Sequence, residues 1–293
     1  MKSKPLLYAL LFLMILGWAG NYIATKVALR YLPPVLLFGI RMSMAGVLML
    51  PVYFWYRKSH PATWKLPDLP LLIAIGIFGV SLNQFFFVWG MSKTSVLHTA
   101  IFANMSPFLV LILVAAIGME RFSGRKFVGV VVALAGVVLL RVGDAEPQGH
   151  ATFWGDLINF LGALAFAIFT VIGKPKANRF GSISVNTISY VGGAMVMAPI
   201  TIWQAAKFPL AALPAAAWLA VFYMALVSSV LAYLVYYYAL AHMEASRLAA
   251  FNYLLPVEAT LLGVWLLGEP ISAGAAGAGI VIFGGIYMVE RAR

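Results

Sequence analysis

The sequence predicts an all-α integral membrane protein of ten transmembrane helices, built as two inverted five-helix repeats with both termini in the cytoplasm. Three observations predict this fold: an apolar composition, a one-sided distribution of basic residues and an internal repeat. Hydrophobic residues fill 63% of the 293 positions, charged residues fill 10%, and the mean hydropathy is +0.95. A soluble domain carries about 25% charged residues, so this chain has too few to cover a surface that faces water.

Apolar runs bounded by charges, Pro and Gly define the expected helices. A helix that crosses a bilayer needs ~20 apolar residues, whereas a spanning strand needs only ~9–11 residues of alternating polarity. The runs are continuous and long, so each is expected to be a helix, and the first is too long for the apolar part of a signal peptide. They cover residues 5–29, 33–56, 69–91, 95–119, 126–140, 153–174, 183–206, 214–241, 245–267 and 272–289.

The basic residues predict the orientation in the membrane. With the N-terminus inside, fourteen Lys and Arg fall in cytoplasmic segments and five fall on the opposite side. Cytoplasmic loops carry the excess of Lys and Arg, so both termini are expected in the cytoplasm and the protein in the cell inner membrane. The net charge of +11 is then explained by topology, and the expected partner is the lipid bilayer and not a nucleic acid. The chain has no cysteine, which excludes disulfides and cysteine metal sites, and no cofactor or metal is expected.

An internal repeat sets the architecture. Pro107 recurs as Pro256, and Glu120 recurs as Glu269, each 149 positions later. Five helices per half is an odd number, so the two halves are expected in opposite orientations, as in many secondary transporters whose substrate site lies near the midplane. The predicted repeats are residues 1–146 and 147–293.

Several motifs carry a family resemblance. They are Gly17-Trp18-Ala19-Gly20-Asn21-Tyr22, Pro33 with Arg41-Met42, Asn104-Met105-Ser106-Pro107 with Gly118-Met119-Glu120-Arg121, and Leu255-Pro256 with Leu266-Leu267-Gly268-Glu269. In these motifs the chain resembles the EamA-type exporters of the drug/metabolite transporter superfamily, and among them it is most similar to YddG-type amino acid exporters. The resemblance implies export of amino acids, aromatic or neutral, or of related small metabolites by alternating access. Glu258 departs from the family pattern, which has an apolar residue there.

Polar and aromatic residues within the apolar runs are the candidates to line a central cavity. Trp18 and Asn21 are three positions apart and therefore share a helix face. Amides and hydroxyls could hold the amino and carboxylate groups of an amino acid, and aromatic rings could hold its side chain. The alternative is that these groups only join helices to one another. The candidate substrate-binding residues are Trp18, Asn21, Asn83, Phe87, His98, Phe102, Asn159, Phe166, Ser229, Tyr233, Tyr237 and Asn252.

Two ionisable residues lie deep in predicted spans, where a charge is a functional hypothesis by default. Arg41 could bind a substrate carboxylate, and Glu258 could couple transport to protons. The alternative for each is a structural role beside backbone carbonyls or polar neighbours, and Arg41 could instead extend towards the outer surface.

A proline within a span and a glutamate at a helix end occur in both halves of the sequence. Pro107 and Pro256 each remove a backbone hydrogen bond within a span, so the sequence predicts kinks there, which act either as paired hinges or as static bends. Glu120 and Glu269 lie at helix ends, where each is expected to cap the helix that follows it.

Small residues line the fifth and tenth runs. They are Gly129, Ala133 and Gly136 in one run, and Gly274, Ala278 and Gly285 in the other. Such faces allow helices to approach closely, so these runs are expected to be peripheral packing helices, with a dimer contact as the alternative. The expected state is a monomer or a homodimer.

Other functional classes are weighed on their motifs. An intramembrane enzyme is not expected, because the chain lacks His-Glu-x-x-His and Gly-x-Ser-x-Gly motifs. A channel would need a ring of carbonyls or like charges along a pore, and no such pattern is visible. A channel and an importer of a small metabolite are the alternatives to an exporter.

Overall fold

The computed structural model describes residues 4–61, 63–91, 93–94, 102, 104–143, 152–258, 261–262 and 273–292 of the chain. Within these residues the regular structure is entirely helical, so the prediction of an all-α protein is confirmed for them. His98 and Glu269, both singled out from the sequence, lie outside the described residues.

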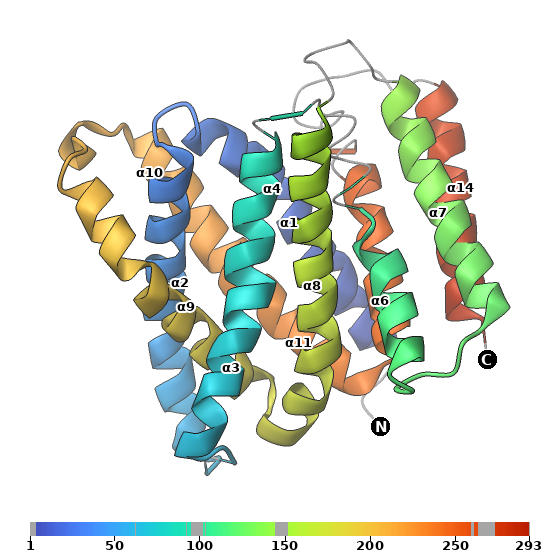
Figure 1. Cartoon of the computed structure of the whole chain (residues 1–293), viewed down its shortest axis with the longest axis horizontal. Helices are drawn as coiled ribbons and strands as arrows, with labels where there is room; N and C mark the ends of the chain where they lie inside the picture. The colour runs from blue at the N-terminus through green and yellow to red at the C-terminus, as the bar shows by residue number, and fades with distance from the viewer. Residues whose placement is uncertain are drawn as a thin grey trace. The chain divides into compact units, whose positions relative to one another are not determined.

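The α-helices follow the apolar runs of the sequence (Figure 1). Their bounds are α1 (Lys4–Ala28), α2 (Pro34–Arg57), α3 (Leu69–Gly76), α4 (Asn83–Met91), α6 (Ser106–Ala116), α7 (Gly124–Gly143), α8 (Phe153–Phe180), α9 (Ser182–Ala205), α10 (Ala215–Tyr223), α11 (Ala232–His242), α12 (Ala245–Ala250) and α14 (Ala273–Glu290). Short 3₁₀ turns add η1 (Leu66–Asp68), η3 (Leu210–Ala212) and η5 (Phe251–Leu254).

Many of these helices are suited to a lipid environment. Among the described residues, 7 helical stretches are long and apolar enough to cross a membrane. They are Pro5–Thr25, Pro34–Arg57, Leu66–Phe87, Phe153–Phe180, Ser182–Ala205, Ala215–His242 and Ala273–Glu290. The chain is therefore a multi-pass membrane protein, while the count of ten spans and the side of the termini stay predictions.

Two spans contain a π-helical segment that the sequence did not predict. The segment η2 (Ile77–Leu82) joins α3 to α4, and η4 (Met224–Leu231) joins α10 to α11. Their last residues, Leu82 and Leu231, are 149 positions apart, which is the offset of the sequence repeat. The π segment is thus part of the duplicated pattern, and π segments in helices frequently occur at functional sites.

By its internal packing the chain divides into two compact units. Unit 1 comprises Met1–Ser81 and Ile172–His242, and unit 2 comprises Leu82–Val171 and Met243–Arg293. Each unit draws on both halves of the sequence. The repeat boundaries at 1–146 and 147–293 describe a duplication and not this packing, and they stay a prediction.

Unit 1 is organised by helix pairs far apart in the sequence. Helix α2 packs along α9, and α1 packs along α10, η4 and α11 (Figure 1). A close approach of α3 to α9 depends on Gly76, because a Cβ there would lie 2.4 Å from the carbonyl oxygen of Ser189. One core cluster joins α1, α2 and α10 through Ala24, Ala28, Leu32, Leu36, Leu37, Ala220, Val221 and Met224.

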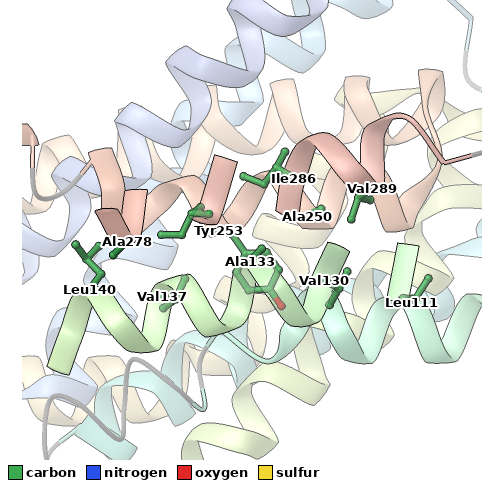
Figure 2. Close-up of a cluster of buried hydrophobic side chains, with 11 residues drawn as sticks. Leu111, Val130, Ala133, Val137, Leu140, Ala250, Tyr253, Ala278, Ile286 and Val289 are labelled. Carbon is green, nitrogen blue, oxygen red and sulfur yellow. The ribbon is translucent and has the colours of Figure 1, made fainter. Parts of the chain in front are cut away.

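In unit 2, α7 packs along α14 over most of its length, and Figure 2 shows the apolar side chains between them. The contact depends on small residues: a Cβ on Gly285 would lie 2.5 Å from both the Gly129 carbonyl oxygen and the Ala133 nitrogen. The predicted close helix approach is confirmed for this pair. These small faces therefore meet each other within one chain, and the opposite face of α14 exposes Ile280, Phe283 and Tyr287.

Candidate substrate-binding site

Unit 1 brings four aromatic rings together on three helices. Trp18 of α1 lies 5.4 Å from Tyr233 and 5.6 Å from Tyr236 of α11, measured between ring centroids. Tyr190 of α9 contacts Tyr233 edge-on at 5.7 Å. The three tyrosines are buried and Trp18 is half-buried, so the rings form one contiguous aromatic group inside the unit. Together with Arg41 and Ser229 we refer to these residues as the Arg41 cluster.

Arg41 supplies the charge of this cluster. Its side chain is 5% exposed, and its Nε donates a hydrogen bond of 3.0 Å to Ser229 Oγ. Tyr190 and Tyr233 lie within electrostatic range of the guanidinium. The side chain is buried among groups of its own unit, and the alternatives for Arg41 stay predictions.

The π segment η4 positions the polar groups of the cluster. Ser229 Oγ donates to the Met224 carbonyl at 2.9 Å, five residues earlier in the same segment. The carbonyl of Ser228 accepts a bond from Trp18 Nε1 at 3.0 Å, and Ser228 Oγ donates to the Gly17 carbonyl at 3.1 Å. Two adjacent residues of η4 therefore hold these side chains: Ser228 bonds to Trp18, and Ser229 bonds to Arg41.

Further polar groups in unit 1 lie near the cluster residues along the same helices. Tyr237 and Ser189 are joined by a hydrogen bond of 3.4 Å between their hydroxyls, and Tyr233 donates to the Gly79 carbonyl at 3.4 Å. Asn21, one turn beyond Trp18 on α1, has a buried Oδ1 with no hydrogen-bond partner among the described residues. Five of the predicted residues of unit 1, namely Trp18, Arg41, Ser229, Tyr233 and Tyr237, thus engage neighbouring helices.

The sequence did not single out Tyr190 and Ser189, although a signal was present. Asn186, Ser189, Tyr190 and Gly193 recur at positions i, i+3, i+4 and i+7, which places them on one helix face. All of these residues are buried. This polar and small face of α9 carries the same kind of pattern as Trp18 and Asn21 on α1.

The predicted amides of unit 2 bond to helix backbones. Asn83 Nδ2 donates to the Gly162 carbonyl at 2.9 Å, which joins α4 to α8. Asn159 Nδ2 donates to the Gly155 carbonyl at 3.0 Å, and its amide packs where a Cβ on Gly90 would lie, 2.6 Å away. The Asn83 bond is of the helix-joining kind that the sequence left as the alternative, whereas the Asn159 bond lies within α8.

The other predicted residues of unit 2 come from several segments of the chain. Phe166 of α8 is buried and packs against Phe169 at 5.4 Å, while Phe87 and Phe102 are half-buried. Asn252, in η5, is 6% exposed and its Oδ1 has no hydrogen-bond partner among the described residues. The substrate-binding prediction for these residues stays a prediction.

Glu258 is the second intramembrane charge of the sequence. Its side chain is 4% exposed, and neither carboxylate oxygen has a hydrogen-bond partner within the described part of the chain. An ionised carboxylate in this state is costly. The structural alternative, in which Glu258 bonds to backbone or a polar neighbour, therefore has no support among the described contacts.

The two duplicated prolines lie at helix starts. Pro107 is the second residue of α6, after a turn at Asn104 and Met105. Pro256 is the second residue of a helical stretch at 255–258 that follows the 3₁₀ turn η5. Proline is tolerated in the first helical turn because its missing N–H has no partner there. The interruption of each helix therefore precedes the proline.

Glu120 caps a helix other than the expected one. Its Oε1 accepts a hydrogen bond of 2.7 Å from the backbone N–H of Ala245, at the start of α12, and Lys126 donates to its Oε2 at 3.2 Å. Lys126 Nζ also donates to Glu244 at 2.9 Å and to Ser246 at 3.0 Å. The expectation that Glu120 caps the following helix, α7, is thus wrong.

These features can be compared with known proteins. Long apolar helices, a buried charged cluster and duplicated π segments describe a polytopic membrane protein with an internal repeat. The EamA-like transporter family model matches residues 5–142 and again 153–291, and the chain belongs to this family. The family is part of the drug/metabolite transporter superfamily, so the predicted family membership is confirmed.

Individual relatives span nearly the whole chain. An uncharacterized transporter from Archaeoglobus fulgidus is 30% identical over 98% of this chain and 99% of its own. A probable amino-acid metabolite efflux pump from Salmonella typhimurium is 22% identical, covering 95% of this chain and 93% of its own. A protein of solved crystal structure shares the fold, with a TM-score of 0.81 at 22% identity over 98% of this chain and 96% of that one.

Proposed function

We propose that this protein is a secondary transporter that exports amino acids, aromatic or neutral, or related small metabolites across the cell inner membrane by alternating access. Membership of the EamA-like transporter family supports transport. The relative from Salmonella typhimurium named as a probable amino-acid metabolite efflux pump supports the substrate class and the direction.

The observation that carries the proposal is the contact of Trp18 with Tyr233 and Tyr236 beside Arg41 and Ser229. An aromatic surface takes the apolar or aromatic side chain of an amino acid, and aromatic pairs contribute ~0.5–1.5 kcal/mol beyond their burial. Arg41 and the hydroxyls provide polar groups for the remainder of the molecule. Such a combination of apolar walls with a few polar groups is typical of small-molecule sites.

The proposal includes two inverted repeats with both termini in the cytoplasm. Inverted repeats allow a rocking motion that exposes one site to each side in turn. The fold and the twofold family match support this arrangement. The order of the motifs and the aromatic content of the chain, which resemble those of YddG-type exporters, support a specificity for aromatic amino acids.

Purified protein in liposomes loaded with labelled phenylalanine tests the transport activity. We expect saturable flux, which a carrier shows and an open channel does not. Trp18→Ala should reduce this flux about tenfold or more, because a loss of about 1.4 kcal/mol corresponds to a factor of ten. Trp55→Ala is the matched control, since Trp55 is 74% exposed on α2 of the same unit.

The direction is tested in cells that contain labelled phenylalanine. Export predicts faster efflux from cells that make the protein than from cells that make Trp18→Ala. Faster uptake with unchanged efflux would instead indicate an importer. No saturable flux of any neutral or aromatic amino acid in liposomes would overturn the proposed substrate.

A further inference from the structure

Within the described part of the chain, the Arg41 guanidinium is a buried cation without an anionic partner. Arginine has five N–H donors, and among the described residues one hydrogen bond, from Nε to Ser229, is formed. No described carboxylate lies within ion-pair distance of Arg41. A buried charge is costly unless it is paired and hydrogen-bonded, so this arginine favours binding of an anion.

Unit 1 has almost no negative charge of its own. Across its two sequence ranges Asp68 is the one acidic residue. Asp68 lies in η1, at the start of the third span, where its Oδ2 accepts a hydrogen bond of 2.9 Å from the backbone N–H of Lys65. The unit therefore offers a ligand a cation at Arg41 and, apart from Asp68, no carboxylate as a counterpart for a ligand's ammonium group.

The rings around Arg41 define the rest of the ligand. The rings of Trp18 and Tyr190 both contact the ring of Tyr233, and Tyr190 and Tyr233 lie within electrostatic range of the guanidinium. A carboxylate is planar and can accept two parallel bonds from a guanidinium. A ligand with a carboxylate attached to an aromatic or apolar body matches both parts of the cluster.

We propose that the Arg41 cluster recognises an organic carboxylate with an aromatic or apolar body, that the carboxylate is required for binding, and that the amino group is dispensable. Amino acids are then one kind of accepted ligand, and arylalkanoic acids are another. The inference rests on the proposed function, since it concerns the ligand of the same site. It goes further, because it separates the two charged groups of an amino acid.

Four ligands that share one phenyl ring test the proposal: phenylalanine, phenylpropanoate, phenylalaninamide and phenethylamine. Their binding to the purified full-length protein is measured by the quenching of its tryptophan fluorescence. Phenylpropanoate should bind within about tenfold of phenylalanine. The two ligands without a carboxylate should bind about 100-fold more weakly or not at all, since losing a charge-assisted pair removes a factor of this order.

Variants assign the effect to the arginine. Arg41→Gln should weaken the binding of phenylpropanoate about 100-fold and leave the binding of phenethylamine unchanged. Arg41→Lys should retain part of the affinity for phenylpropanoate, because lysine keeps the positive charge but lacks the two parallel N–H donors of a guanidinium. Arg30→Gln, an exposed arginine of the same unit, is the control. If Arg41→Gln does not fold, the comparison of the four ligands on the unaltered protein decides alone.

The outcomes separate this inference from the proposed function. Phenethylamine binding as tightly as phenylpropanoate, no binding by either carboxylate, or full carboxylate affinity in a folded Arg41→Gln variant would each overturn the inference. Selective carboxylate binding without any amino acid flux in liposomes would overturn amino acid export and leave carboxylate recognition standing. Amino acid flux that is unchanged in Arg41→Gln would overturn carboxylate recognition by Arg41 and leave amino acid export standing.

Discussion

The carboxylate of Glu120 accepts a hydrogen bond of 2.7 Å from the backbone N–H of Ala245, although the two residues are 125 positions apart in the chain. The same carboxylate pairs with Lys126, and the exposed fractions of the two side chains are 5% and 3%. One side chain thus joins the loop before α7 to the start of α12.

Replacing Glu120 by Ala should destabilise the protein. The change leaves Lys126 buried with one ionic partner, Glu244, and leaves the first N–H groups of α12 without an acceptor. Removing one partner of a buried ion pair costs about 3–5 kcal/mol, so thermal unfolding in detergent should occur at a clearly lower temperature. Arg121→Ala, at the exposed neighbouring position, should leave the unfolding temperature unchanged. Equal unfolding temperatures for both variants would contradict the assigned role.

The contact of α7 with α14 predicts opposite effects for two adjacent glycines. Gly285→Ala places a methyl group 2.5 Å from backbone atoms of α7, and overpacking of this kind costs ~1–3 kcal/mol. Gly284→Ala meets nothing within 4 Å and replaces a flexible helix residue, which stabilises by roughly 0.5–1 kcal/mol. Thermal unfolding of the two variants should therefore shift in opposite directions. A Gly285→Ala protein as stable as Gly284→Ala would show that the helices are further apart than described.

The absence of cysteine makes the predicted topology directly measurable. Ser59→Cys and Ala206→Cys each place one thiol at an exposed position in a different loop. With the N-terminus in the cytoplasm, the loop that contains Ser59 is inside and the loop that contains Ala206 is outside. A membrane-impermeant maleimide added to intact cells should label Ala206→Cys and spare Ser59→Cys until the cells are opened. The reversed pattern would place both termini outside.

Substitution of Glu258 tests two predictions, one on the stability of the protein and one on proton coupling. Leu109 lies 149 positions earlier, so Glu258→Leu gives this position the residue of its repeat counterpart. Because the buried carboxylate has no partner among the described residues, the substitution should raise the unfolding temperature.

If Glu258 couples transport to protons, Glu258→Leu and Glu258→Gln should also make liposome flux independent of an imposed pH gradient. Flux that responds to the gradient equally in the unaltered protein and in Glu258→Gln would remove the coupling role while leaving the stability prediction in place. Ser106→Ala, another buried polar change in the same unit, controls for a general effect of apolar substitution.

Sequence periodicity could predict features that are set within a single helix, such as which residues lie on its polar face. Trp18 and Tyr233 could be proposed for the site because a polar or aromatic residue in a long apolar run has to face protein or water. The partners of Glu120 could not be predicted in this way. Its position at a helix end was visible, but the choice between α7, four residues on, and α12 depends on how distant segments pack.

The positions of the prolines and the π segments show a second limit of prediction from sequence, which concerns where a helix is interrupted. Hydropathy continues without a break through Met224–Leu231, so the extra residue of that turn leaves no mark on the apolar pattern. Pro107 was visible, but the turn before it is set by Asn104 and Met105, whose types are compatible with a helix. The pattern of a span predicts that a helix exists, and local hydrogen bonding decides where it is interrupted.

The matched ends of η2 and η4, at Leu82 and Leu231, also bear on the history of the chain. An extra residue at equivalent places in both copies is what a single-copy ancestor that already contained it would leave. Deleting one residue from Met224–Leu231 would restore a regular helix and turn the following segment by roughly 100° about its axis. Tyr233 and Tyr236 would then point away from Trp18, so the extra residue in Met224–Leu231 sets which side of that helix meets α1.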